Sequence, residues 1–317
     1  MYDELLDAWD LPRPRELIRS AFGMSNESYF VKSAAGDHIL RIYISKSLQA
    51  IRFEHEVLQR LVGADLPFRT PRPLPTVRGD TVEVDVDSAR PCALFLRIPG
   101  ETLDDADTIA VGRAAEAFAR LDIALAAIER TDLPSPVFAG DLRAMHPAIT
   151  DLGRLDELIG PRGQDMAERA AERAGPTYSS LPTQLIHGDF GFGNVLVHGS
   201  RIRGVVDFEY SGRNVRAMEL AGGLASAIAR EARESLWRPL LRGYLGTLPL
   251  DPVEVAALPA LAVLHWAVIV VWWAGQLLDG HPFPDGLTPL VDRALAVDGW
   301  MDAHGRELVA EALRAGG

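Results

Sequence analysis

Cysteine is nearly absent from this chain of 317 residues, in which Cys92 is the only one. A single thiol excludes an internal disulfide and a metal cluster built from several cysteines. Cys92 lies in the apolar run 92–96. We therefore expect a buried, inert thiol rather than a nucleophile.

Lysine is scarce as well, because Lys32 and Lys46 are the only lysines among the 32 basic residues. Arginine therefore supplies nearly all of the positive charge. The 44 acidic residues exceed the basic ones and give a net charge of −12 and a pI near 5.1. Nucleic-acid phosphates favour a basic surface, so this balance argues against a nucleic-acid partner.

The first residues, Met1 to Glu4, lack the basic and then apolar order of a signal peptide, so we expect a cytoplasmic protein. One stretch, 256–278, is long and apolar enough to cross a bilayer. Acidic residues flank it on both sides, without the Lys/Arg bias of a membrane span. We predict a buried core helix with a late start near Pro259, and a membrane-anchored protein is the alternative.

Hydrophobic residues make up 48% of the chain and charged residues 24%, which is typical of a globular rather than a disordered protein. A single core is near its size limit at this length, so we expect two domains. The hydrophobic patterns predict strands and one helix in the first hundred residues, at 28–31, 38–43, 81–86 and 92–98 and at 49–62. Helical spacing then dominates, apart from a strand-rich island at 184–210. The predicted fold class is α+β, with a small β-rich lobe and a larger, mainly helical lobe.

The island contains polar residues in the pattern His187-x-Asp189-x-x-x-x-Asn194, and its second strand ends at Asp207. Phosphoryl transfer from a nucleotide needs one carboxylate to orient the attacking hydroxyl and accept its proton. It also needs a second carboxylate and an amide oxygen to hold Mg²⁺ against the phosphates. Asp189 fits the first role, and Asn194 and Asp207 fit the second. Asp and Asn beside glycine also form simple turns, but turn chemistry alone seldom produces the whole pattern.

This motif resembles that of the aminoglycoside phosphotransferase and choline kinase-like family. These small-molecule kinases share the protein-kinase fold and include homoserine kinase type II-like members. The resemblance implies a bilobal protein-kinase-like fold, with a nucleotide-binding lobe at 1–97, a hinge at 98–101 and a helical lobe at 102–317. It also implies ATP or GTP as the phosphoryl donor, Mg²⁺ as the cofactor and a small-molecule hydroxyl as the acceptor, with no nucleic-acid or membrane partner. The oligomeric state stays open.

Further segments resemble family elements in the same order along the chain. The run 23–26 resembles the loop that covers the nucleotide phosphates, which implies phosphate contacts from Ser25 and Asn26. Arg41 resembles the cation that pairs with the phosphates, and Glu54 resembles the helix glutamate that orients this cation. Protein kinases use lysine in place of Arg41, which differs in reach and geometry.

Other positions bear on the same comparison. Lys32, one strand before Arg41, is an alternative cation. The segment 93–100 resembles the last strand and hinge, which implies adenine contacts to the backbone at Leu96 and Ile98. Glu219 stands where the family usually has aspartate, and we expect it to brace the catalytic loop, as we expect of His187. Glu209 replaces the glycine of a kinase Asp-Phe-Gly.

The acceptor is open among aminoglycosides, homoserine, choline, other amino alcohols and sugars. Acidic residues of the helical part are candidates to attract an amine, although we expect solvated surface charges: Asp156, Glu157, Asp279, Asp285, Asp292 and Asp302. For Trp266, Trp272 and Trp273 we favour core packing over an aromatic cage. A catalytically inactive, nucleotide-binding pseudokinase is the alternative function. The presence of both Asp189 and Asp207 argues against it.

Overall fold

The computed structural model describes residues 2–20, 26–104, 107–135, 138, 140–229, 235–281 and 286–316. The chain divides into two compact units, each built from segments that are distant in the sequence. Unit 1 consists of Met1–Glu101, Ala127–Ser135 and Leu196–Glu209, and unit 2 consists of Thr102–Ala126, Pro136–Val195 and Tyr210–Gly317. The predicted lobe limits at residues 97, 98–101 and 102 stay a prediction.

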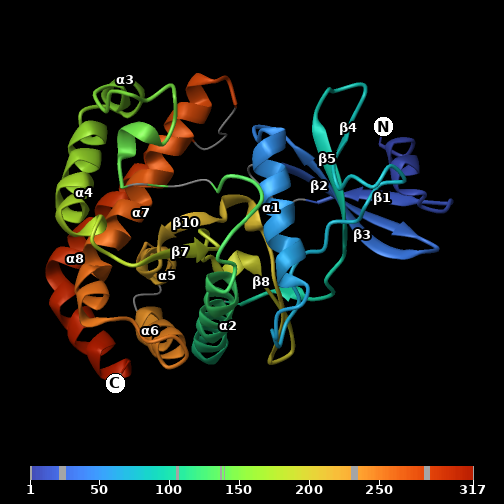
Figure 1. Cartoon of the computed structure of the whole chain (residues 1–317). Coiled ribbons are helices and arrows are strands. Elements are labelled where there is room, and N and C mark those ends of the chain that lie inside the picture. Colours follow the sequence, from blue (N-terminus) through green and yellow to red (C-terminus); the bar gives the residue numbers. More distant parts are fainter. Residues whose placement is uncertain are drawn as a thin grey trace. The chain divides into compact units, whose positions relative to one another are not determined.

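An antiparallel sheet of five strands forms the centre of unit 1, in the order β1-β2-β3-β5-β4 (Figure 1). The strands are β1 (Glu16–Arg19), β2 (Asn26–Ser33), β3 (Gly36–Tyr43), β4 (Glu83–Val84) and β5 (Pro91–Leu96). The strands predicted at 28–31, 38–43 and 92–98 are confirmed, and β1 was not predicted. The strand predicted at 81–86 is shorter, because Asp85 begins a turn in which its carboxylate accepts the N–H of Ser88 at 3.0 Å.

Helix α1 (Leu48–Leu61) confirms the helix predicted at 49–62. Its first turn is capped by Ser47, whose hydroxyl accepts the N–H of Ala50 at 3.2 Å. The apolar side chains of one face are buried, as a helical period requires. Glu54 lies among these buried side chains, so its charge needs compensation from residues of the sheet. Strands β8 (Val195–His198) and β9 (Arg201–Val205) lie almost wholly within unit 1 as well.

The core of unit 1 contains Cys92 together with Val31, Leu40, Ile42 and Leu94. Burial raises the pKa of the Cys92 thiol to about 12, with the carboxylates of nearby acidic residues acting in the same direction. The thiolate is therefore disfavoured at neutral pH, and the expected buried, inert thiol is confirmed.

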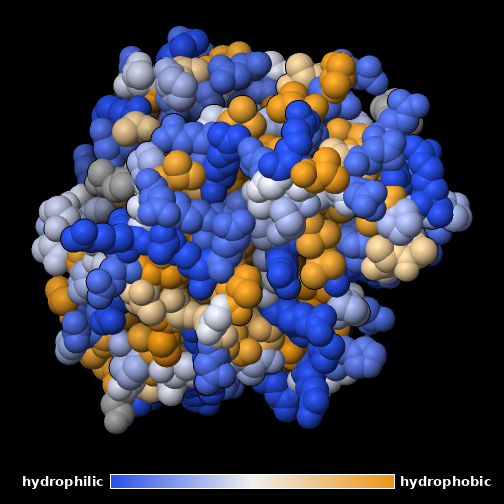
Figure 2. All heavy atoms as spheres, turned by 45° about the vertical axis from the view of Figure 1, so that its right-hand side comes forward, coloured by the Kyte–Doolittle hydropathy of each residue, from blue (hydrophilic) through white to orange (hydrophobic). Residues whose placement is uncertain are grey.

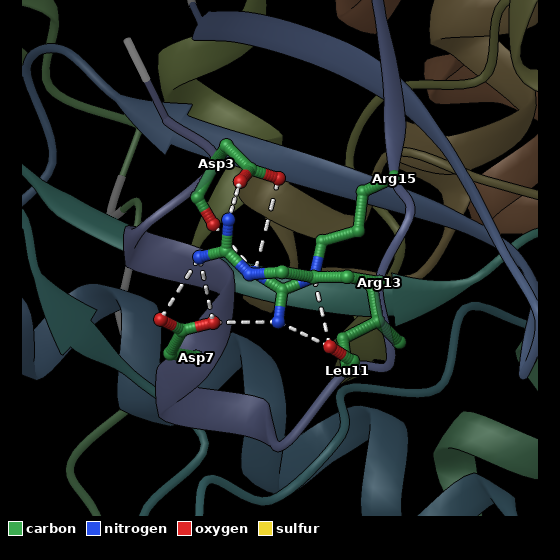
Figure 3. A network of polar contacts seen from close by, with 5 residues as sticks. All are labelled: Asp3, Asp7, Leu11, Arg13 and Arg15. Carbon is green, nitrogen blue, oxygen red and sulfur yellow. Dashed lines mark hydrogen bonds and ion pairs between the residues drawn. The ribbon is translucent and has the colours of Figure 1, made fainter.

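A network of charges joins the N-terminal 3₁₀ helix η1 (Leu5–Trp9) to the start of β1 (Figure 3). Arg15 is nearly buried, and its guanidinium donates to the carboxylate of Asp7 at 2.6 Å and to the carbonyl oxygen of Leu11. Arg13 binds the carboxylates of Asp3 and Asp7. Two arginines thus hold the first turn of the chain against the sheet.

Unit 2 is mainly helical. Its helices are α2 (Thr108–Ala126), α3 (Arg154–Ile159), α4 (Arg162–Tyr178), α5 (Ala217–Ile228), α6 (Trp237–Leu245), α7 (Pro252–Leu278) and α8 (Thr288–Ala315). Shorter elements are β6 (Glu101–Thr102), β7 (Thr183–Ile186), β10 (Gly212–Val215), η2 (Leu142–Ala144), η3 (Phe192–Asn194) and η4 (Phe208–Tyr210). β7, which ends just before His187, pairs with β10, which begins after Asp207, in antiparallel fashion. This pairing joins the two ends of the segment that contains the motif. The predicted α+β class is confirmed.

Helix α7 is the long apolar helix that the sequence predicts, but its predicted late start is wrong. It begins at Pro252, where Asp251 and Glu254 form a capping box, and Pro259 lies inside it. The strong N-terminal cap fixes the start seven residues before Pro259, and that proline ring packs toward Gly305 of α8.

By length and composition, α7 is the one helix of the described residues that could cross a membrane, and 61% of its most apolar window is buried inside the structure. α7 packs against α4, α5 and α8. Trp266 is buried and donates its indole N–H to the carbonyl oxygen of Ala225 at 3.1 Å, as core packing requires. These contacts favour a core helix.

The face drawn in Figure 2 is mainly hydrophilic, with apolar residues interspersed among charged ones. Exposed large hydrophobic residues come from many different elements, including Ile18, Val86, Ile109 and Leu313. Scattered exposed apolar residues are ordinary at protein surfaces and indicate no particular binding site.

Gly243→Ala is expected to destabilise unit 2 by about 1–3 kcal/mol, because overpacking shifts neighbouring backbone. A Cβ atom at Gly243 of α6 would lie 2.1 Å from the carbonyl oxygen of Gly112 in α2. Gly299→Ala in α8 is the matched control, since a Cβ atom there meets nothing within 4 Å. It should stabilise the protein by about 0.5–1 kcal/mol through its higher helix propensity. Urea unfolding of both variants measures the difference, and equal effects would contradict the close helix packing.

Candidate active site

The segment from His187 to Asn194 leaves β7 as a tight loop. Gly188 has a φ of +84°, and a Cβ atom there would lie 2.4 Å from the carbonyl oxygen of Tyr210. Side chains other than hydrogen would be strained in this conformation and would also clash. Glycine at 188 is therefore what lets the chain turn directly before Asp189.

Asp189 is held in place by Asn194. The side-chain Nδ2 of Asn194 donates to Oδ2 of Asp189 at 2.8 Å and to its carbonyl oxygen at 3.0 Å. The structure thus brings two of the predicted site residues into direct contact. Because this contact uses the amide nitrogen, the amide oxygen is the atom through which Asn194 can bind a cation.

His187 is fully buried beneath the loop. Its Nδ1 accepts the N–H of Asp189 at 3.3 Å, and its ring lies edge-on to Phe118 with 5.3 Å between the ring centroids. Phe118 also stacks on Phe190 of the loop. An enclosed histidine that accepts a loop N–H has the placement expected of a bracing residue.

Glu219 of α5 also contacts the catalytic loop. Its Oε2 accepts the N–H of Gly188 at 2.9 Å, and its side chain is buried. Burial raises the pKa of Glu219 to about 8; the backbone amides of Gly188 and His187 act against this rise, and the carboxylate of Asp189 adds to it. The bracing contact expected of Glu219 is present.

In unit 1, Arg41 of β3 connects Glu54 of α1 with Asp207. Its Nη1 lies 3.4 Å from Oε1 of Glu54, and its Nη2 lies 3.1 Å from Oδ1 of Asp207. The side chains of Arg41, Glu54 and Asp207 are 17%, 4% and 32% exposed. Three predicted site residues therefore meet in one partly buried cluster.

Asp207 follows β9 in a left-handed backbone conformation, with a φ of +72°. Such values are uncommon outside glycine, and aspartate and asparagine tolerate them best. The conformation turns the chain out of β9 at the residue whose carboxylate reaches Arg41. Backbone shape, as well as side-chain chemistry, thus favours aspartate at this position.

Arg41 is the shared cation of several carboxylates in this cluster. Burial raises the pKa of Glu54 to about 7, and Glu209 and Asp207 act in the same direction against the lowering effect of Arg41. Burial opposes the charge of Arg41 itself, but Asp207 and Glu54 outweigh it and raise the pKa of Arg41 above its ordinary value. Arg41 therefore stays charged, and Glu54 is the group that takes up a proton near neutrality.

Glu54→Gln is expected to flatten the pH dependence of stability between about pH 5 and pH 8. The pKa of Glu54 is about 7 in the folded protein, whereas the ordinary value for a glutamate is 4.5. The native state therefore keeps a proton that the unfolded chain has lost. This contribution to stability is complete at low pH and is lost as the pH rises through about 7. Urea unfolding across the pH range measures the slope.

Glu56 on the same helix provides the control for this prediction. Although burial acts against it, the N–H groups of Asp132 and Leu133 and the nearby Arg60 lower the pKa of Glu56. Its contribution to stability is therefore lost as the pH falls, which is the opposite sign. Glu56→Gln should alter the acidic limb alone. An unchanged neutral slope in Glu54→Gln would show that Glu54 is not the titrating group.

Asn26 begins β2 and has both ends of its side chain engaged. Its Nδ2 donates to Oε2 of Glu209 at 2.6 Å, and its Oδ1 accepts the N–H of Ile44 at 3.3 Å. Lys46 donates to the carbonyl oxygen of Glu209 at 2.6 Å. Asn26 thus ties β2 to the segment after β9, and its phosphate contact stays a prediction. Ser25, predicted with it, lies outside the described residues.

The remaining predicted nucleotide contacts lie near the end of β5. The N–H of Leu96 donates to the carbonyl oxygen of Arg72 at 3.2 Å, so this amide is already engaged. Ile98 lies just beyond the strand, and adenine contacts at both positions stay a prediction. The alternative cation Lys32 has a side chain that is 52% exposed and pairs with Glu16 at 3.4 Å. Of the two cations, Arg41 is therefore the one that lies beside other predicted site residues, Glu54 and Asp207.

Carboxylate and amide oxygens are the donors that Mg²⁺ prefers in proteins, so the chemistry of Asp207 and Asn194 fits this ion. Asp207 of unit 1 presents a partly exposed carboxylate, and Asn194 of unit 2 contacts Asp189 through its amide nitrogen rather than its amide oxygen. Within the described residues, no group of three or more His, Cys, Asp or Glu side chains could hold a metal on its own. A metal site that uses Asp207 and Asn194 stays a prediction.

Sequence reasoning missed several residues behind these side chains. The hydroxyl of Tyr43 lies 3.4 Å from Oε2 of Glu54 and 3.3 Å from Nε2 of His55. Asp122 of α2 binds the hydroxyl of Tyr244 in the interior of unit 2. A signal for Asp122 was available, since it lies four residues after Phe118 and therefore on the buried face of its helix.

A sequence model of the phosphotransferase enzyme family matches residues 17–258 of this chain, which include the residues described above. The chain belongs to this family. It is therefore a phosphotransferase, and the predicted small-molecule kinase activity is confirmed at this level. A curated homoserine kinase of Methylobacillus glycogenes is 25% identical over 285 residues, covering 88% of this chain and 84% of the relative.

Solved structures support the fold assignment. The microcompartment-associated aminopropanol kinase matches with a TM-score of 0.66 and 19% identity, covering 98% of each chain. An amicoumacin kinase in complex with AMP-PNP, Ca²⁺ and its ligand matches with a TM-score of 0.66 and 17% identity, covering 94% of this chain and 96% of the other. The predicted protein-kinase-like fold of this phosphotransferase is confirmed.

Proposed function

We propose that this phosphotransferase transfers the γ-phosphoryl group of ATP to the hydroxyl group of a small amino alcohol, with homoserine as the first candidate. The observation that carries the proposal is the loop in which Asn194 holds the carboxylate of Asp189. A carboxylate fixed in this way can accept the proton of an incoming hydroxyl without first reorganising.

The substrate class rests on the chemistry that the named relatives share. Homoserine and aminopropanol each combine a hydroxyl group with an amine, and these are the substrates in the names of two similar proteins. The net charge of −12 suits a cationic acceptor of this kind. GTP as the donor, and aminoglycosides, choline or sugars as acceptors, are outcomes that the test distinguishes.

Each predicted residue has a place in the proposed reaction. Asp189 orients the acceptor hydroxyl and takes its proton as the oxygen attacks phosphorus. Arg41, oriented by Glu54, stabilises negative charge on the nucleotide phosphates. Backbone groups near Leu96 and Ile98 bind the adenine, and the segment around Ser25 and Asn26 covers the phosphates. We also keep the lobe limits 1–97, 98–101 and 102–317 and a cytoplasmic location as proposals.

Asn194 and Asp207 would hold Mg²⁺ through one amide oxygen and one carboxylate. Bound there, Mg²⁺ would neutralise the charge that accumulates on the phosphoryl oxygens during transfer. In the structure, Asp207 is paired with Arg41. The two cations would then share this carboxylate, or Arg41 would move toward the phosphates when nucleotide binds.

A nucleotide-consumption screen tests the proposal. The purified protein is incubated with ATP or GTP and Mg²⁺, and with amino alcohols, aminoglycosides and sugars as separate acceptor sets. Turnover that needs an amino alcohol supports the proposal, and mass spectrometry of the product locates the phosphate on oxygen. Turnover with aminoglycosides or sugars alone would contradict the substrate class. Nucleotide binding without turnover on any acceptor would favour the pseudokinase.

A further inference from the structure

The two oxygens of the buried Glu54 carboxylate have different partners in unit 1. Oε1 lies 3.4 Å from Nη1 of Arg41, and Oε2 lies 3.4 Å from the hydroxyl of Tyr43. Arg41 and Tyr43 are two positions apart on β3, so their side chains share one face of the sheet. Residues of a single strand therefore contact this carboxylate at both of its oxygens.

A buried histidine extends this arrangement on the side away from Arg41. His55 follows Glu54 on α1, and its Nε2 lies 3.3 Å from the hydroxyl of Tyr43. Its Nδ1 lies 2.7 Å from the hydroxyl of Thr81. The ring packs edge-on against Phe95, with 5.5 Å between the ring centroids. Both ring nitrogens therefore have a polar partner in a fixed place.

The position of Thr81 is fixed by the residue before it. The carboxylate of Asp80 accepts the N–H of Thr81 at 2.7 Å, and it also pairs with Arg52 of α1 at 2.7 Å. The hydroxyl of Thr81 is thus anchored to the same helix that carries His55.

His55 stays neutral in these surroundings. Burial lowers the pKa of His55 to about 3, the positive charge of Arg41 acts in the same direction, and the carboxylate of Asp80 opposes them only in part. A neutral imidazole has one N–H, so one ring nitrogen donates and the other accepts. The hydrogen bonds of the ring therefore decide which nitrogen holds the proton.

The ionised carboxylate of Glu54 sets the direction of all these hydrogen bonds. It can only accept, so Tyr43 donates its single hydroxyl hydrogen to Oε2. The oxygen of Tyr43 then accepts from His55, which places the ring proton on Nε2. Nδ1 is left as an acceptor, and the hydroxyl of Thr81 donates to it. We call this arrangement, from Thr81 through His55 and Tyr43 to Glu54, the hydrogen-bond series.

We propose that Tyr43 and His55 are positioning residues, which hold the Glu54 carboxylate so that it directs Arg41 toward the nucleotide phosphates. A carboxylate whose second oxygen is held by Tyr43 cannot turn to bind the guanidinium through both oxygens, which is the common geometry of such pairs. Arg41 therefore keeps Nη2 for a second anion, and in the structure this anion is Asp207 at 3.1 Å.

Neither Tyr43 nor His55 reaches a reacting atom, and both act through Glu54. The contact of Arg41 with the phosphates rests on the proposed function. The direction of the hydrogen-bond series depends only on the contacts within unit 1. The two parts of the proposal therefore need separate measurements.

Nitrogen NMR of the histidine rings tests the direction of the series without any substrate. Above pH 7, where Glu54 is ionised, wild-type His55 should be neutral with its proton on Nε2. The signals of this ring are identified by their contacts with Phe95. Tyr43→Phe removes the acceptor of the Nε2 proton but keeps Thr81 beside Nδ1, so the proton should move to Nδ1. A proton on Nδ1 in the wild type, or one that stays on Nε2 in Tyr43→Phe, would overturn the proposal.

Tyr29→Phe is the matched control. Tyr29 of β2 also donates its hydroxyl to a glutamate, Oε2 of Glu27 at 3.0 Å, in the same sheet. This variant should leave the proton of His55 on Nε2. Thr81→Val tests the series from its other end if Tyr43→Phe does not fold. It removes the donor to Nδ1 alone, so the proton should stay on Nε2, and a move to Nδ1 would also overturn the proposal.

Calorimetric titration with ATP and Mg²⁺ tests the positioning role. Tyr43→Phe should raise Kd for the nucleotide about tenfold, as expected for the loss of one hydrogen bond to a charged group. KM for ATP should rise with it while kcat changes less, and Tyr29→Phe should match the wild type in all three quantities. Unchanged affinity in Tyr43→Phe would overturn the positioning role.

The outcomes separate this proposal from the proposed function. If the protein turns over no acceptor, the proposed function fails, and the ring proton of His55 and the nucleotide affinity still decide the proposal. If the wild type binds no nucleotide, the proposed function and the positioning role fail together, and the NMR measurement alone decides the direction of the hydrogen-bond series.

Discussion

Replacing Asp189 with asparagine is expected to lower kcat by about 10²–10⁴-fold, the usual contribution of a positioned general base. The amide oxygen of the new side chain can still accept the hydrogen bond that Asn194 donates to Asp189 at 2.8 Å. The loop should therefore keep its shape, and nucleotide affinity should stay close to that of the wild type. Steady-state kinetics with the best acceptor and calorimetric titration with the nucleotide measure the two quantities.

Asp292→Asn is the control for this variant. Asp292 lies on α8 with a side chain that is 56% exposed, and it pairs with Arg162 at 3.1 Å. Exposed pairs of this kind contribute little, so its kinetics should match those of the wild type. If Asp189→Asn keeps full kcat, Asp189 is not the base. If it loses nucleotide affinity and kcat together, Asp189 acts mainly in binding.

Arg41→Met is expected to lower the free energy of unfolding by about 3 kcal/mol, because it leaves the buried carboxylate of Glu54 and the partly exposed carboxylate of Asp207 without their cation. Arg41 is the charge that Glu54 and Asp207 share, at 3.4 and 3.1 Å. The effect should be smaller at low pH, since burial raises the pKa of Glu54 to about 7 and a protonated Glu54 needs no cation. Urea unfolding on both sides of neutrality measures the difference. The same variant should raise KM for the nucleotide if Arg41 contacts the phosphates.

Arg41→Lys and Lys32→Met complete this experiment. A lysine at position 41 restores one positive charge but not the planar guanidinium whose two nitrogens reach two carboxylates, so it should rescue stability only in part. Lys32→Met removes the exposed alternative cation and should change stability by less than about 1 kcal/mol. A large loss of nucleotide affinity in Lys32→Met, with none in Arg41→Met, would transfer the phosphate-binding role to Lys32.

The catalytic loop could be predicted because its chemistry is contiguous. Asp189 and Asn194 lie five positions apart, and the structure joins them directly. Gly188 between His187 and Asp189 already indicated a sharp turn, and the positive φ explains it. Local patterns of this kind carry their own geometry, so the motif and the family resemblance pointed to the same residues.

Long-range partners could not be predicted in the same way. Arg41 and Asp207 belong to distant parts of the chain, and their contact depends on the register of β3 and on the left-handed backbone at Asp207. The hydrogen bond from Asn26 to Glu209 likewise joins distant parts of the chain. Asn26, for which the sequence predicted a phosphate contact, therefore also has a structural partner. Sequence patterns identify such residues as candidates but do not say which oxygen each nitrogen meets.

Helix α7 and Asp122 show where local rules were overridden. Pro259 suggested a late helix start, but the capping box at Asp251 and Glu254 fixes an earlier one. Asp122 lies on an apolar helix face where an aliphatic residue would be the simple choice. The structure shows that its carboxylate accepts the hydroxyl of Tyr244, a partner that lies far away in the sequence.

Composition and motif by themselves determined the near absence of thiol chemistry, the α+β class, the phosphotransferase family and the identity of the loop residues. The resemblance of the segment around Arg41 to the cation-bearing strand of related kinases made Arg41 the candidate for a role that protein kinases give to lysine. Only the tertiary structure decided that Arg41 is shared by two carboxylates and that Glu219 accepts the N–H of Gly188 in the catalytic loop. The physical reason is that charge compensation and burial depend on distances between elements, which the order of residues along the chain does not contain.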